Sequence, residues 1–189
     1  MYTVRLSEGS SFFVFASSSL AGELYAGRDL DDLLLDALRG EDERVRATEK
    51  ALDLLSRSEH SVKMLRMKLQ KRGFSRPLVE EILEKMEDKG YINNRRFAEL
   101  FLEAKRRKRK EGRGKLRSRL LEKGISDETI DELLSEMGDE EEVEALERAG
   151  ESLLIKRGMT KEKFYAGLLR RGFESRLVRR YVEDTFKKS

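Results

Sequence analysis

The sequence lacks cysteine altogether and holds a single histidine, His60, and a single proline, Pro77. Without cysteine the chain cannot form a disulfide framework, a cysteine-based metal site or a cysteine nucleophile. Long apolar runs are absent too, since no stretch approaches the roughly 18 apolar residues that a membrane-spanning helix needs. The first residues show no basic segment followed by an apolar run, which is the pattern of a signal peptide. We therefore expect a cytoplasmic protein.

Hydrophobic residues are scarce and charged residues are abundant. The 189 residues are 38% hydrophobic and 41% charged, against roughly 45–50% and about 25% in typical globular chains. A chain this polar does not fill one thick core, so we expect small cores in series. Side-chain amides are also rare, with one Gln and two Asn, and this preference for ion-pairing groups over amides is typical of thermophilic proteins.

The charges are nearly balanced overall but unevenly distributed. Lys and Arg number 40 against 37 Asp and Glu, which gives a net charge of +3. The first fifty residues carry −4, the second fifty +3, the third fifty −2 and the remainder +6. Segregation of this kind is a weak indication of a polyanionic partner.

The first 45 residues differ from the rest because they contain strand-forming segments. Two such runs, 2–6 and 12–15, flank a glycine turn and predict a β-hairpin. A lone hairpin is marginal in water, so we expect it to pack on a helix over 29–38. The apolar face of that helix would consist of Leu30, Leu33, Leu34 and Leu38. Residues 1–45 are therefore interpreted as an N-terminal extension.

From about residue 46 the sequence is helical in pattern, and one motif occurs three times. In segments 68–74, 119–125 and 167–173 a leucine lies four residues before a glycine, and a large apolar residue follows the glycine. Basic residues immediately precede each glycine. This is the pattern of a helix C-terminus, where cations oppose the negative end of the helix dipole and glycine adopts the left-handed conformation. The three glycines are Gly73, Gly124 and Gly172.

The register continues beyond each glycine. Apolar residues recur at helical spacing, six, nine and ten positions after it: Val79, Ile82 and Leu83; Ile130, Leu133 and Leu134; Val178, Tyr181 and Val182. A further helix precedes each motif, over about 47–58, 95–111 and 140–157. The sequence thus predicts an all-α fold of three tandem three-helix repeats in an elongated curved array. The repeats would span residues 46–93, 94–139 and 140–189.

The strongest functional signal is a basic run over 105–119, in which ten of fifteen residues are cations and one is an acid. A charge run is usually the solvated surface of a helix, but this density exceeds what solubility needs and favours binding of a polyanion such as DNA. The run contains Gly112-Arg113-Gly114-Lys115, yet the full spacing of a phosphate-binding loop is absent and no strand precedes it. The candidate DNA-binding residues are Lys105, Arg106, Arg107, Lys108, Arg109, Lys110, Arg113, Lys115, Arg117 and Arg119.

A second basic set lies in the last repeat. Part of it fits helix capping, but three of its arginines share one helix face, so capping and ligand binding stay equally open. This possible second basic face consists of Arg170, Arg171, Arg176, Arg179 and Arg180. Between the two basic regions lies an acidic run over 139–147. It fits the start of a helix, and a protein-binding or self-pairing role is the alternative.

No catalytic constellation is evident. His60 lies between two predicted helices, where a turn residue is the simplest interpretation, and one histidine without cysteine argues against a zinc site. No pair of carboxylates is marked out for metal binding or acid–base chemistry. We therefore expect no metal, no cofactor and no enzymatic activity. The aromatic residues of the repeats are assigned to core packing: Phe74, Tyr91, Phe97, Phe101, Phe164, Tyr165, Phe173, Tyr181 and Phe186.

The region from about Ala47 to Phe186 resembles the RecX family of regulatory proteins. The matching elements follow one another along the chain: Ala51-Leu52, Leu54-Leu55-Ser56, Leu65, Lys68-Leu69, Gly73-Phe74, Gly90-Tyr91-Ile92-Asn93-Asn94, Phe97-Ala98, Gly112, Gly114, Leu120 and Gly124-Ile125. In this order the elements are specific. One departure is Asn93-Asn94, where the family usually has an aspartate, but asparagine also caps helices. The third repeat is the least similar part.

The resemblance implies a function that composition does not supply. RecX-like proteins modulate the RecA recombinase in recombination, DNA repair and the SOS response, usually as inhibitors of its DNA-dependent ATPase and of strand exchange. They are thought to lie in the groove of the RecA–DNA filament. The expected partners are the RecA filament and single- or double-stranded DNA, bound by a monomer. Two alternatives stay open: a general nucleic-acid-binding helical protein without a recombinase partner, and an enzyme such as a nuclease.

Overall fold

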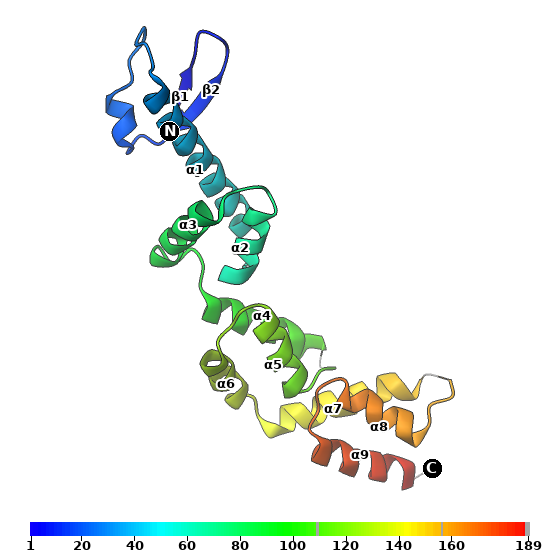
Figure 1. The fold of residues 1–189 in the computed structure, drawn as a ribbon. Coiled ribbons are helices and arrows are strands. Elements are labelled where there is room, and N and C mark those ends of the chain that lie inside the picture. The colour runs from blue at the N-terminus through cyan, green and yellow to red at the C-terminus, as the bar shows by residue number, and fades with distance from the viewer. Residues whose placement is uncertain (109, 156, 188–189) are drawn as a thin grey trace. The chain divides into compact units, whose positions relative to one another are not determined.

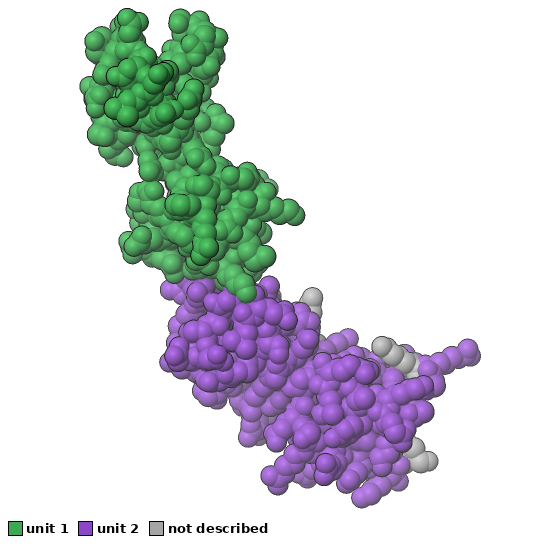
Figure 2. Space-filling view, viewed as in Figure 1, with its two compact units in different colours: residues 1–92 green, residues 93–189 purple. Residues whose placement is uncertain are grey.

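The computed structural model describes residues 1–108, 110–155 and 157–187, apart from the side chains of Arg107 and Lys108 (Figure 1). The chain divides into two compact units, residues 1–92 and 93–189 (Figure 2). Within the described ranges the long elements are all α-helices, and the strands form one two-stranded sheet near the N-terminus. The predicted all-α repeat fold with an N-terminal hairpin is confirmed.

The N-terminal hairpin consists of β1 (Tyr2–Arg5) and β2 (Ser11–Val14), paired antiparallel with Tyr2 opposite Val14. Gly9 makes the turn with φ 95°, in the left-handed region where a side chain would be strained. A short 3-10 helix, η1 (Ser19–Gly22), follows. The residues between η1 and the first long helix contain no further regular element.

Strand β2 packs on the first helix, α1 (Asp32–Arg57), which Asp31 caps by accepting the Leu34 N–H at 2.8 Å. The strand contributes Val14, which is fully buried, and the helix contributes Leu34 and Leu38. Leu33 is 82% exposed, so its assignment to the packed face was wrong. It precedes Leu34 by one residue, and the helical rotation of about 100° per residue turns it out of the contact.

Two carboxylates of α1 complete the contact with the hairpin. Asp42 accepts the Phe13 N–H at 2.8 Å and Glu41 accepts the Phe15 N–H at 3.3 Å. Both carboxylates are buried, and each is also paired with an arginine one turn later on α1. The helix is continuous from residue 32 to 57, so the predicted helices over 29–38 and 47–58 are one element, and the proposed boundary at 45/46 lies inside it.

The rest of the chain is a series of helices in three sets. The first set adds α2 (Val62–Gln70) and α3 (Arg76–Asp88) to α1; the second is α4 (Asn94–Lys108), α5 (Arg113–Glu122) and α6 (Asp127–Ser135); the third is α7 (Asp139–Leu154), α8 (Lys161–Leu169) and α9 (Ser175–Lys187). Gly73, Gly124 and Gly172 follow the second helix of each set, with φ 91°, 82° and 82°. The predicted equivalence of the three glycines is confirmed. The division into repeats at 93/94 and 139/140 stays a prediction.

Each set has a small core built on the predicted register. The leucine four residues before each glycine has no exposed surface, nor has the apolar residue six positions after it: Leu69 and Val79, Leu120 and Ile130, Leu168 and Val178. The other stripe positions are buried or partly buried. Among the aromatics, Tyr91 is 51% exposed and does not belong to a core.

Local signals also hold at the helix ends. Asn93 caps α4 by accepting the Arg96 N–H at 2.9 Å, so asparagine serves as the cap where aspartate is usual. His60 lies between α1 and α2, as predicted, but is buried, with 2% of its surface exposed. Its Nδ1 lies 2.7 Å from the Ser58 carbonyl oxygen and its Nε2 faces the Lys68 ammonium. The buried ring thus has a polar partner at each of its two nitrogens.

Candidate nucleic-acid interface

The basic run over 105–119 lies in the second compact unit and does not form one helix. The helix predicted over 95–111 ends at Lys108, and Gly112 begins the next as the N-cap of α5, with φ −80° and ψ 168°. Of the ten cations, Arg109 and the side chains of Arg107 and Lys108 lie outside the described residues. Of the other seven cations, some bind groups of the protein itself and others are available to a ligand.

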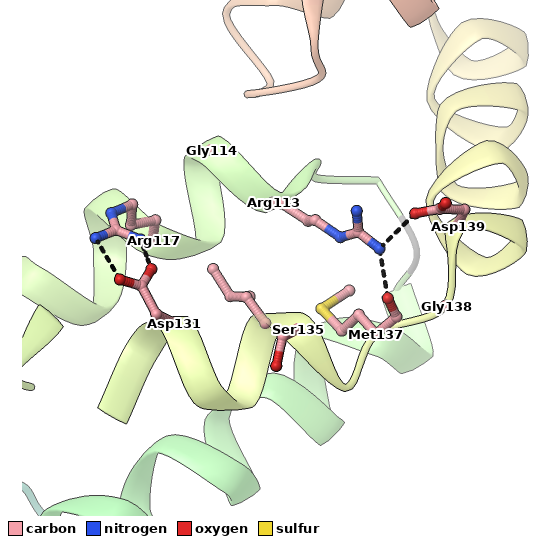
Figure 3. Close-up of a pocket in the computed structure, with 9 residues that line it drawn as sticks. Arg113, Gly114, Arg117, Asp131, Ser135, Met137, Gly138 and Asp139 are labelled. Carbon is pink, nitrogen blue, oxygen red and sulfur yellow. Dashed lines mark hydrogen bonds and ion pairs between the residues drawn. The ribbon is translucent and has the colours of Figure 1, made fainter. Parts of the chain in front are cut away.

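Arg113 is bound on several sides by the start of α7. Its guanidinium pairs with Asp139 at 3.0 Å and donates to the carbonyl oxygen of Met137 (Figure 3). It also pairs with Glu142 at 3.2 Å. Glu142 is buried and also accepts the Arg113 peptide N–H at 3.3 Å. Charge-assisted bonds of this kind are strong, so Arg113 holds α5 against α7.

Arg117 is held by two carboxylates of α6. It pairs with Asp131 beside the open pocket that Arg113 also lines (Figure 3). It also pairs with Asp127 at 2.5 Å. The hydrogen bonds that the Arg117 guanidinium donates to Asp131 and Asp127 raise its pKa, and the guanidinium lowers the pKa of Asp131. Arg117 thus also binds within the protein.

Two further arginines of the run are paired. Arg106 lies 3.3 Å from Glu141 in the first turn of α7, and Arg119 lies 2.6 Å from Glu111. The acidic run over 139–147 begins α7, as predicted, and three of its carboxylates bind arginines of the basic run. The favoured interpretation as a helix start is confirmed, and the same carboxylates also pair with arginines of this chain.

Three lysines of the run remain. Lys105 lies over the ring of Phe101, 5.5 Å from its centroid, in a cation–π contact. Lys110 is exposed and Lys115 is partly exposed, and no carboxylate of the described residues pairs with either one. Lys110 and Lys115 are therefore the described cations of the run with the greatest freedom to bind a ligand. DNA binding by the run as a whole stays a prediction.

The second basic set divides in the same way. Arg171 is partly buried and donates to the Ala149 carbonyl oxygen at 2.9 Å and to the Ser152 hydroxyl at 2.8 Å. Burial lowers the pKa of its guanidinium, which stays charged at neutral pH. The remaining members are exposed and have no carboxylate partner among the described residues: Arg170, Arg176, Arg179 and Arg180.

The Gly-x-Gly segment at the start of α5 makes a close backbone contact with the turn between α8 and α9. The Gly112 N–H donates to the Arg171 carbonyl oxygen at 2.9 Å, and the Gly114 N–H donates to that of Gly172 at 3.0 Å. A Cβ on Gly112 would lie 2.6 Å from the Gly172 oxygen, closer than Cβ atoms approach such atoms. The glycines therefore permit a junction between the second and third helix sets, and protein carbonyls occupy N–H groups that could otherwise bind an anion.

Two kinds of site are absent from residues 1–108, 110–155 and 157–187. No helix there combines the length and the apolar character needed to cross a membrane. In the same part of the chain, no group of three or more His, Asp or Glu side chains is placed to hold a metal ion.

Two models of protein-family domains match this sequence. The description "RecX, first three-helix domain" matches residues 47–86, and "RecX, second three-helix domain" matches residues 93–134. The first match covers the C-terminal part of α1 with α2 and most of α3, and the second match covers nearly all of α4, α5 and α6. The third set lies outside both matches, in keeping with its weaker resemblance.

Whole proteins and solved structures give the same result. A regulatory protein RecX from Chlorobium phaeobacteroides is 35% identical over 145 residues, which are 75% of this chain and 95% of that protein. The one from Bacillus subtilis is 30% identical over 82% of this chain, which spans only 59% of that longer protein. A crystal structure of regulatory protein RecX superposes with a TM-score of 0.78 at 25% identity, covering 97% of this chain and 92% of the other. RecX from Lactobacillus salivarius shares the fold, with a TM-score of 0.64 at 22% identity over 76% of this chain and 96% of the other.

Proposed function

The chain belongs to the RecX family of regulatory proteins, and from that premise we propose that it binds the RecA–DNA filament and inhibits RecA. The inhibited activities are the DNA-dependent ATPase and strand exchange, in recombination and DNA repair. The protein acts by binding, without catalysing a reaction of its own. The observation that carries the proposal is the 35% identity to a regulatory protein RecX over 95% of that protein's length.

The distribution of paired charges favours a ligand that consists of both protein and DNA, such as a RecA–DNA filament, over bare DNA. Of the ten cations in the basic run, Arg106, Arg113, Arg117 and Arg119 are held by carboxylates of the protein itself. A cation that is paired with a carboxylate of the protein does not contact a phosphate, and fewer phosphate contacts mean a lower electrostatic affinity for nucleic acid. A protein with fewer available cations gains more from a partner that also offers a protein surface.

The test is the rate of ATP hydrolysis by RecA on single-stranded DNA, measured over a titration of this protein. We expect the rate to fall as the protein is added. A DNA-dependent ATPase unrelated to RecA, assayed on the same DNA, is the control for simple masking of the DNA. Inhibition of RecA alone supports the proposal, whereas equal inhibition of both enzymes supports a general nucleic-acid-binding protein. A RecA rate that does not change would refute the proposal.

A further inference from the structure

We propose that Lys110 and Lys115 from the second helix set and Arg170 and Arg176 from the third form one cationic surface, the junction surface, which binds the phosphate backbone of a DNA single strand. The proposal rests on the proposed function in taking DNA as the partner. It joins two basic regions that are about sixty residues apart in the sequence into one site.

The backbone contact at the start of α5 brings the two regions together. Besides the two peptide hydrogen bonds to Arg171 and Gly172, an ideal Cβ on Gly172 would lie 2.0 Å from the Lys115 nitrogen and 2.6 Å from the Lys115 Cβ. The first turn of α5 and the α8–α9 turn therefore touch along their main chains (Figure 1). The Lys115 side chain therefore begins directly beside the α8–α9 turn.

The other three cations lie close to this contact along the chain. Lys110 precedes Gly112 by two residues and Arg170 precedes Gly172 by two, so each Cα is at most about 8 Å from the contacting glycine. Arg176 follows Gly172 by four residues, at most about 15 Å away. The Debye length at physiological ionic strength is about 8 Å, so the Cα atoms of Lys110, Lys115 and Arg170 lie within about one screening length of the contact, and the exposed Arg176 extends the surface along α9.

The members of the junction surface are available, in contrast to the arginines nearby. Lys110, Arg170 and Arg176 are exposed, Lys115 is partly exposed, and none is paired with a carboxylate of the described residues. The exposed Glu174 lies in the same turn and leaves the cations in excess.

The junction surface consists of cationic side chains, and the backbone contact between α5 and the α8–α9 turn positions them. The N–H groups of Gly112 and Gly114 are already bound by carbonyl oxygens, so the helix N-terminus itself offers little to a phosphate. Arg113, paired with Glu142, and Arg171, bonded to Ala149, hold in place the start of α5 and the α8–α9 turn, which carry the cations of the surface.

The test compares salt dependences of binding to poly(dT). We expect the slope of log affinity against log salt to fall by about 0.7 per lost phosphate contact. The double variants K110Q/K115Q and R170Q/R176Q should each lose about 1.4, and the quadruple variant roughly 3. The matched control is K71Q/R76Q, which removes two exposed cations around the equivalent turn of the first helix set, where a Cβ on Gly73 would meet no atom within 4 Å. An unchanged slope in the quadruple variant, or an equal loss in the control, overturns the proposal.

A second pair of variants tests the geometry without removing charge. Gly172→Ala should weaken poly(dT) binding because its Cβ meets the Lys115 main chain, whereas Gly73→Ala, with the same positive φ and open space around it, should not. Circular dichroism establishes that each variant folds, and if Gly172→Ala does not fold, the charge variants decide. The RecA ATPase assay separates the two proposals. Wild-type protein that binds poly(dT) through these cations but leaves RecA unaffected refutes the proposed function alone.

Discussion

Replacing Gly112 by alanine should destabilise the protein far more than replacing Gly138 by alanine. Both glycines are N-caps with extended backbone, of α5 and α7, and neither has a positive φ. The new methyl group at 138 has no neighbour within 4 Å. At 112 it would lie 2.6 Å from the Gly172 carbonyl oxygen and 2.7 Å from the Phe173 Cα. These are main-chain atoms, which cannot rotate away as a side chain can.

The magnitude follows from the two ways in which the junction can respond. If it stays closed, overpacking costs about 1–3 kcal/mol. If it opens, the peptide hydrogen bonds of Gly112 and Gly114 are lost, at about 0.5–1.5 kcal/mol each. Both routes give a loss of about 1–3 kcal/mol beyond the cost of alanine at an N-cap, which the two variants share.

The assay is urea denaturation followed by circular dichroism, with amide hydrogen exchange to locate the change. In Gly112→Ala we expect a lower midpoint and faster exchange at the amide of Gly114. In Gly138→Ala exchange at that amide should match the wild type. Equal midpoints for the two variants would refute the reasoning, because they would mean that the start of α5 does not touch the α8–α9 turn in solution.

Three further predictions concern other parts of the molecule. Phe164→Ala, at a core position with no exposed surface, should lower the free energy of unfolding by about 3–5 kcal/mol, and a loss below 1 kcal/mol by urea titration would contradict the assigned core. Arg117 lowers the pKa of Asp131, so their pairing stabilises the fold above the ordinary carboxyl pKa and is lost as the pH falls through the lowered one. Asp131→Asn should therefore make the melting temperature less sensitive to acid below about pH 4; an unchanged acid dependence would count against the pair. Deleting residues 1–30, which spares the Asp31 cap, should lower the melting temperature yet leave the helices intact by circular dichroism, and a molten product would contradict this.

The repeat architecture could be predicted because its signals are local. A helix stop needs a glycine that tolerates positive φ and cations in the preceding turn, and both lie within a few residues of each other. Gly73, Gly124 and Gly172 therefore revealed the three equivalent helix ends. The buried stripe followed from counting at helical spacing, as with Val79 and Ile130, which have no exposed surface.

The state of the basic run could not be predicted because it depends on residues far away in the sequence. Arg113 and Glu142 are 29 positions apart, and only the path of α5, α6 and α7 brings them to 3.2 Å. Charge density alone does not distinguish a cation held by the protein from one open to a ligand. The available signal was the acidic run at 139–147, whose opposite charge and nearby position indicate a partner for the basic run.

The Gly-x-Gly segment was recognised as a family element, but its partner was not. Gly112 contacts a turn sixty residues later, and nothing in its neighbours indicates that distance. For Gly172 the sequence predicts only one role, which is to end helix α8. Its second role, the close approach to Lys115, is a tertiary property that leaves no additional mark on the local sequence.

The carboxylates that α1 presents to the hairpin have a consequence for self-association. The outward N–H groups of Phe13, in β2, and of Phe15, just after its end, continue one strand edge, and such an edge is a template for pairing with a strand of another molecule. Asp42 and Glu41 occupy those donors at 2.8 and 3.3 Å. A second chain can add to this edge of β2 only by displacing two buried carboxylates that are also paired with arginines. Helix α1 therefore protects an aromatic strand against edge-to-edge aggregation.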